Sequence, residues 1–166
     1  MTFAGLKLSA PIELALKEKG FVKPTPIQLQ AIPILMQGLD LIGQAQTGTG
    51  KTAAFGVPLL EFCKDKQGLQ ALILVPTREL AVQVTQEMDE MAKHLSTRTV
   101  AVYGGASLEH QAHDIKEGAN IVVGTPGRLI DHIRRGSLQL AKIKMLILDE
   151  ADRMLDMGFI DDVELI

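Results

Sequence analysis

Short apolar runs that alternate with longer stretches of helical periodicity constrain the fold of this 166-residue chain most strongly. Each run is rich in Val, Ile and Leu and lacks polar alternation, as expected of strands that are covered on both faces. Strands and helices that alternate at this spacing predict βαβ units and a parallel sheet. The predicted strands are residues 39–43, 71–75, 99–103, 120–123 and 144–148.

The predicted helices lie between these strands and before the first one. They are residues 11–19, 27–37, 51–62, 77–94, 108–117 and 128–134. The predicted fold is therefore a doubly wound α/β domain with helices on both faces of a mainly parallel sheet, and the length suits a single domain over residues 1–166. Ligands of such folds bind at the carboxyl ends of the strands.

The composition limits the classes of partner. Seventeen Lys and Arg residues against twenty Asp and Glu residues give a net charge of −3, so nucleic acid would have to be bound by local groups rather than by bulk charge. One cysteine, Cys63, excludes an internal disulfide framework. No apolar run has the length of a membrane span, and the first residues do not read as a secretory signal. We therefore expect a cytoplasmic protein without a membrane partner.

A candidate phosphate-binding loop follows the first predicted strand and leads into a helix. Its glycines would let backbone N–H groups face the phosphates of a nucleotide, Lys51 would reach the β- and γ-phosphates, and the Thr52 hydroxyl would bind Mg²⁺. The alternative is a glycine-rich turn that only begins a helix. The first glycine of the general P-loop pattern is replaced by alanine. The loop comprises Ala45, Gln46, Thr47, Gly48, Thr49, Gly50, Lys51 and Thr52.

Carboxylates stand directly after the last predicted strand, at Asp149, Glu150 and Asp152. Asp149 is placed to hold Mg²⁺ through water, and Glu150 is the candidate to orient and deprotonate an attacking water. The alternative is that Asp149 only caps the helix that begins near Ala151.

The base of the nucleotide is the next question. The guanine-reading pattern Asn-Lys-x-Asp is excluded, because Asn120 is the only asparagine and Ile121 follows it. Gln28 could read adenine instead, because its amide both donates and accepts, and the ring of Phe21 is nearby in sequence. By spacing alone, Gln28 could equally be a solvated surface residue.

These segments resemble the motifs of the N-terminal RecA-like domain of DEAD-box ATP-dependent RNA helicases, in order and over nearly the whole chain. The resemblance implies ATP and Mg²⁺ as cofactors and RNA as partner. It also implies that Phe21 and Gln28 select adenine, that Glu150 is the base, and that Asp152 couples the nucleotide site to the rest of the domain. Alanine at position 45 is usual in this family. The matching segments are the Q motif at 20–28 with Phe3 upstream, motif I at 45–52, motif Ia at 76–81, the GG motif at 104–105, motif Ib at 125–128 and motif II at 149–152.

The same motifs predict a second surface, which would hold an RNA backbone without reading its bases. Glycine N–H groups, a threonine hydroxyl and a helix N-terminus can each bind a phosphate. The alternative is that the Pro-Thr-Arg-Glu and Thr-Pro-Gly-Arg segments are only helix starts, although a capped N-terminus can serve both purposes. The candidate RNA-binding residues are Pro76, Thr77, Arg78, Gly104, Gly105, Thr125, Pro126, Gly127 and Arg128.

The family's catalytic unit has two RecA-like domains, and this sequence resembles only the first, with residues 1–38 as its Q-motif region. We find no Ser-Ala-Thr of motif III, so we expect a C-terminally incomplete domain whose second RecA-like partner lies elsewhere in a longer protein. By itself the chain is expected to bind nucleotide with little or no turnover. Two alternatives stay open: a P-loop translocase that acts on DNA, and a nucleotide-binding interaction module without turnover.

Overall fold

The computed structural model describes residues 3–166 and divides them into two compact units. The N-terminal unit comprises the described residues up to Asp65 together with Glu87–Thr97, and the sheet unit comprises Lys66–Gln86 and Arg98–Ile166. Helix α4 (Arg78–Met91) contributes residues to both units. None of the described helices is long and apolar enough to cross a membrane.

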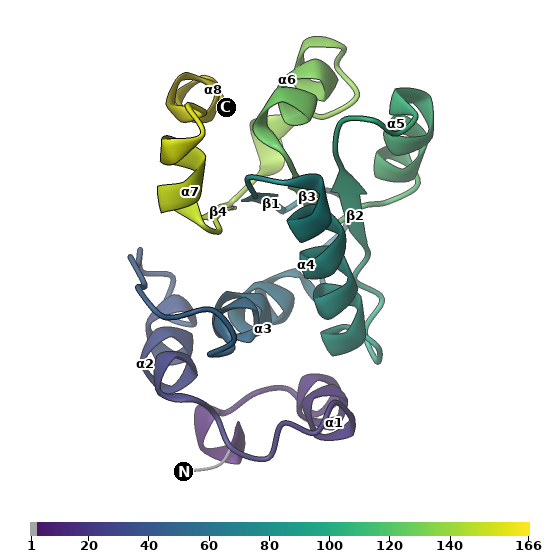
Figure 1. Cartoon of the computed structure of the whole chain (residues 1–166). Coiled ribbons are helices and arrows are strands. Elements are labelled where there is room, and N and C mark those ends of the chain that lie inside the picture. Colours follow the sequence, from purple (N-terminus) through teal and green to yellow (C-terminus); the bar gives the residue numbers. More distant parts are fainter. Residues whose placement is uncertain (1–2) are drawn as a thin grey trace. The chain divides into compact units, whose positions relative to one another are not determined.

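The N-terminal unit is helical (Figure 1). Helices α2 and α3 pack against each other, and the fully buried side chains of Ile12, Ile32 and Leu59 belong to its core. Phe3 stacks on Phe21 with ring centroids 6.3 Å apart. Its elements are η1 (Phe3–Leu6), α1 (Ala10–Glu18), α2 (Pro26–Leu35) and α3 (Lys51–Cys63).

The sheet unit is built on four parallel strands in the order β2-β3-β1-β4. The inner strands β1 and β3 are buried along their whole length, as their unbroken apolar runs predict. The strands are β1 (Ala71–Leu74), β2 (Thr99–Val102), β3 (Ile121–Gly124) and β4 (Met145–Leu148).

Helices that follow the strands supply the rest of the core. Leu129 of α6 and Met154 of α7 pack with Leu72, Val102 and Val122 of the sheet, and Figure 1 shows α6, α7 and α8 together on one side of the strands. The remaining elements are α5 (Leu108–Lys116), α6 (Pro126–Arg134), η2 (Leu140–Lys142), α7 (Ala151–Asp156) and α8 (Ile160–Leu165).

The prediction of a strand at 39–43 is wrong. These residues lie in an irregular segment, and Leu39, Leu41 and Ile42 are exposed, Ile42 at 99%. A strand requires a neighbour that pairs with its N–H and C=O groups. In the described part of the chain, the paired strands are β1, β2, β3 and β4, and residues 39–43 pair with none of them. An apolar run without a pairing partner does not form a strand.

Candidate nucleotide and RNA-binding site

The phosphate-binding loop enters helix α3 through a glycine in the left-handed conformation. Gly50 is the N-cap of α3 with φ 83° and ψ 31°, and Gly48 has φ 77°. Lys51 and Thr52 therefore stand in the first turn of a 13-residue helix, where free N–H groups and the helix dipole favour an anion. The strand predicted to precede this loop is absent, so the strand–loop–helix setting is present only as loop and helix.

Gln28 of α2 is joined to this loop. Its Nε2 donates to the Gly50 carbonyl at 3.0 Å, and its Oε1 accepts from the Thr25 backbone N–H at 2.9 Å. The side chain is not a solvated surface group, because Gln28 is only 2% exposed. A Cβ on Gly50 would collide with the Gln28 amide nitrogen. The positive φ of Gly50 favours glycine there, and a side chain at this position would displace the Gln28 amide.

Phe21 follows α1 in the same unit and is half-buried, with an aromatic and a cationic neighbour. Phe3 stacks on the ring at an interplanar angle of 16°, and Lys19 Nζ lies 5.9 Å from its centroid. The upstream aromatic residue at position 3 thus supports the position of Phe21.

In the sheet unit, the DEAD tetrad begins where β4 ends. The Asp149 N–H donates to the Leu74 carbonyl at 3.0 Å, and Asp149 Oδ1 accepts from the Glu150 N–H at 3.1 Å. The N-cap of α7 is Glu150, without a side-chain capping bond. The N-cap position of α7 is therefore occupied by Glu150 and not by Asp149.

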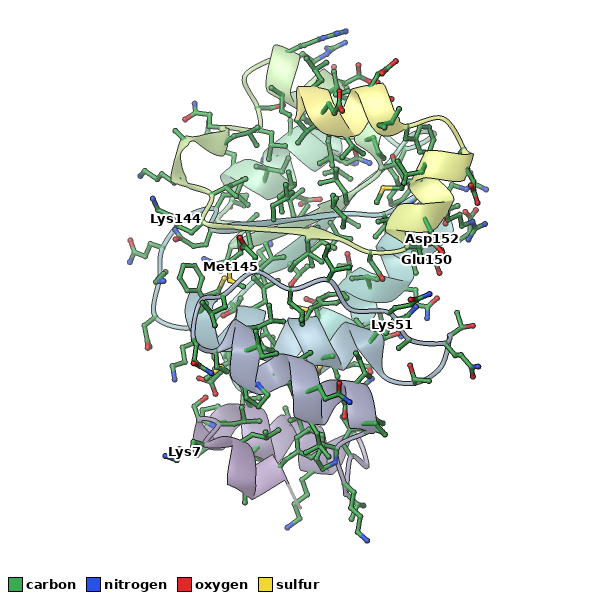
Figure 2. All side chains as sticks on the ribbon, turned by 90° about the vertical axis from the view of Figure 1, so that its left-hand side faces the viewer. Lys7, Lys51, Lys144, Met145, Glu150 and Asp152 are labelled. Carbon is green, nitrogen blue, oxygen red and sulfur yellow. The ribbon has the colours of Figure 1, made fainter. Side chains whose placement is uncertain are left out.

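Glu150 adopts a left-handed backbone conformation, φ 53° and ψ 46°. For a residue other than glycine, such a conformation costs about 1–3 kcal/mol and is concentrated at functional sites. The Glu150 carboxylate is 22% exposed and pairs with Arg153 Nη1 at 3.1 Å. Figure 2 shows Glu150 and Asp152 at the start of α7, and Asp152 is exposed there.

The carboxyl ends of the other three strands carry the candidate RNA-binding residues. Arg78 opens α4 after β1, Gly105 follows β2, and Thr125 follows β3. Arg78 pairs with Glu79 at 2.6 Å, and its Nη1 lies 3.7 Å from where a Cβ on Gly105 would stand. The topology therefore brings these residues, together with Asp149, to one edge of the parallel sheet, as the sequence predicts.

The two predicted threonine caps differ. Thr77 Oγ1 accepts from the Leu80 N–H at 3.3 Å at the start of α4, whereas the Thr125 side chain makes no capping bond at α6. A Cβ on Gly127 would meet no atom within 4 Å. At the start of α6, the Thr125 hydroxyl is therefore not used as a helix cap, and there is space beside Gly127 for an approaching group.

Arg128 is less available than the sequence suggests. Its side chain is only 13% exposed, and Nη1 donates to the Ala106 carbonyl and to Gln111 Oε1, both at 2.9 Å. Gln111 was not predicted to belong to the site, because it lies on α5 outside every motif. The sequence could have indicated Gln111 only as a polar residue on the helix face that packs against the sheet.

Mg²⁺ fits the donor types on offer, since it prefers carboxylate and hydroxyl oxygens and keeps several waters. Thr52 supplies a hydroxyl and Asp149 a carboxylate, each in the described part of its own unit. No group of three or more His, Cys, Asp or Glu side chains able to hold a metal ion occurs among residues 3–166.

Known proteins match this chain in both sequence and structure. The chain is 53% identical to the ATP-dependent RNA helicase DeaD of Escherichia coli (strain K12) over 99% of its length, which is 27% of that protein. It is 54% identical to the protein of the same name from Klebsiella pneumoniae. The chain spans about a quarter of the length of these curated relatives.

Two solved structures have the same fold. The crystal structure of a DEAD box protein from the hyperthermophile Methanococcus jannaschii superposes with a TM-score of 0.95 and 48% identity, over 99% of this chain and 45% of that one. The crystal structure of a hypothetical ATP-dependent RNA helicase from Sulfolobus tokodaii superposes with a TM-score of 0.89 and 39% identity, over 95% of this chain and 46% of that one. The fold is therefore α/β and RecA-like. The family model described as DEAD/DEAH box helicase matches residues 25–166, and the chain belongs to the DEAD/DEAH box helicase family.

Proposed function

We propose that this chain is the ATP-binding and RNA-backbone-binding domain of an ATP-dependent RNA helicase. The observation that carries this proposal is the phosphate loop, in which Gly48 and Gly50 turn the backbone into α3 so that Lys51 and Thr52 stand at the helix N-terminus. The names of the two bacterial relatives, which match almost the whole chain, support it.

In this proposal, the loop from Ala45 to Thr52 binds the phosphates of ATP, and Gln28 with Phe21 selects adenine. The Gln28 amide already donates once and accepts once within the protein. It retains one N–H and one lone pair, which match the acceptor and donor of adenine.

Hydrolysis requires a water that attacks the γ-phosphorus while the bond to the bridging oxygen of ADP breaks. Glu150 is proposed to orient that water and accept its proton, with Asp152 coupling the nucleotide site to the rest of the domain. Mg²⁺, held by Thr52 directly and Asp149 through water, would neutralise the charge of the phosphate oxygens when bound.

RNA is proposed to lie along the carboxyl edge of the sheet, where Arg78, Gly105 and the start of α6 offer donors to phosphates rather than to bases. Turnover and duplex unwinding are assigned to a larger protein with a second RecA-like domain in cis. The chain by itself is proposed to bind nucleotide with little or no turnover.

The test compares ATP hydrolysis by such a two-domain protein with single-stranded RNA and with DNA of the same sequence. We expect RNA to stimulate ATP hydrolysis and DNA to stimulate it little. Stimulation by DNA alone would instead indicate the translocase alternative.

A further inference from the structure

A buried polar network connects the two loops of the proposed RNA-binding surface. Its centre is Gln111 of α5, which is 6% exposed. Gln111 Nε2 donates to the Tyr103 carbonyl at 3.0 Å, and Oε1 lies 2.9 Å from Arg128 Nη1 and 3.1 Å from His132 Nε2. The amide thus touches the loop after β2 and two residues of α6.

The partners determine the orientation of this amide. The Tyr103 carbonyl can only accept and the Arg128 guanidinium can only donate, so the nitrogen and the oxygen of the Gln111 amide cannot be exchanged. His132 Nε2 must then carry a hydrogen in order to donate to Oε1. The other ring nitrogen of this fully buried histidine lies 2.8 Å from Ser137 Oγ.

The contacts hold the glycine loop at both ends. Tyr103 precedes Gly104 and Gly105, and Ala106 follows them; the Tyr103 carbonyl is held by Gln111 and the Ala106 carbonyl by Arg128 at 2.9 Å. Gly105 has φ 87°, so the loop has a shape that few other sequences adopt. Arg128 belongs to the first turn of α6, and α6 forms the second half of the surface.

We propose that Gln111 is a positioning residue for RNA binding: its amide fixes the glycine loop relative to the N-terminus of α6. This rests on the proposed function, because it assumes that both loops bind RNA. Gln111 is buried and does not itself contact RNA. In that orientation, the Gln111 oxygen can also accept from His132 Nε2.

Replacing Gln111 with the similarly long Met removes the network while keeping most of its volume. Arg128 and the Tyr103 carbonyl then lose a buried partner, and the loop is no longer held for phosphate binding. We expect Gln111→Met to weaken the affinity for a single-stranded RNA oligonucleotide roughly tenfold. The affinity for ADP should stay unchanged, because no contact of the network involves Gln28 or the phosphate loop.

The matched control is Gln86→Met, the same substitution at an exposed position of α4, which should change neither affinity. Gln111→Glu is the second variant. It keeps an acceptor for Arg128 and His132 but cannot donate to the Tyr103 carbonyl, so it should lose RNA affinity to a smaller extent. It also keeps the test valid if the Met variant fails to fold.

Fluorescence anisotropy gives the RNA affinity, a competition titration gives the ADP affinity, and hydrogen exchange of the Gly104, Gly105 and Ala106 amides gives a readout that needs no RNA. Faster exchange in Gln111→Met together with selective loss of RNA affinity supports the inference. If the unchanged chain binds RNA and Gln111→Met binds it equally well, or if RNA and ADP affinities fall together, the inference is wrong. If the unchanged chain binds no RNA, the proposed function itself fails and the inference with it.

Discussion

Gln28 has a structural role in the fold and, in the proposed function, a second role in binding the ligand. Gln28→Ala removes its bonds to Gly50 and Thr25 and the amide proposed to read adenine. We expect the preference for ATP over GTP to fall by about 1–2 kcal/mol, as measured by parallel titrations of the two nucleotides. Equal titration curves for ATP and GTP on the unmutated chain would refute the assignment.

Glu150 is the residue on which the proposed chemistry depends. Glu150→Gln keeps the size of the side chain and removes the base, so in a two-domain protein ATP should still bind while hydrolysis falls roughly a hundredfold or more. Lys51→Ala is the contrasting variant, because loss of a phosphate partner should weaken ATP binding itself. Unchanged turnover in Glu150→Gln would mean that another residue is the base.

His132 makes stability depend on pH. Burial lowers its pKa below the ordinary value of about 6.5; the charge of Arg128 lowers it as well, Asp131 opposes the shift and Arg135 adds to it. The unfolded chain therefore takes up the proton at a higher pH than the folded chain does. The stability that comes from keeping His132 neutral is fully present above about pH 6.5. It is lost as the pH falls from there towards the lower pKa of the folded chain.

We expect the free energy of unfolding to decrease on acidification by more in the unmutated chain than in His132→Gln. Denaturant titrations across this range measure the difference. An imidazole that titrates at or above its ordinary pKa in the folded chain, followed by NMR, would contradict this prediction.

At the scale of the element, the junction of β3 with α6 has no room for a side chain at Gly124. A Cβ there would lie 2.5 Å from Val102 Cγ2 and 2.8 Å from Leu129 Cδ2, and Val102 has little rotamer freedom to move away. Gly124→Ala should therefore lower the free energy of unfolding by about 1–3 kcal/mol. Denaturant melts should show no comparable loss for Gly127→Ala, whose Cβ would meet open space; equal losses would argue against the steric cause.

Local sequence patterns predicted most elements but not every one. Helices α1 to α6 and strands β1 to β4 lie within a few residues of their predicted bounds, because buried runs and helix caps are local signals. The strand at 39–43 failed because pairing is not local: its apolar side chains find no ladder partner and are exposed.

At the scale of the whole molecule, the sequence identified the residues of the motifs. It did not identify the residues outside the motifs that contact them. Gln111 contacts Tyr103, Arg128 and His132, which are 8, 17 and 21 residues away along the chain. No periodic pattern or motif spacing encodes such contacts. The left-handed backbone conformation of Glu150 could not be predicted from the sequence either, because glutamate is not a residue type that indicates a positive φ.

In the proposed function, this chain binds ATP and RNA and needs a second RecA-like domain for turnover. Lys51, Thr52, Asp149 and Glu150 are proposed to hold phosphates, metal and water, but none of them supplies the arginine finger expected from that second domain. Such a finger is worth about 10³–10⁵ in rate, so its loss should outweigh every smaller defect.

The most direct test is steady-state ATP hydrolysis, with and without single-stranded RNA, by the 166-residue chain and by a protein that carries both domains. We expect RNA-stimulated turnover for the two-domain protein and no appreciable turnover for the chain alone, although the chain still binds ATP. RNA-stimulated turnover by the chain alone at a rate comparable to the two-domain protein would contradict this expectation.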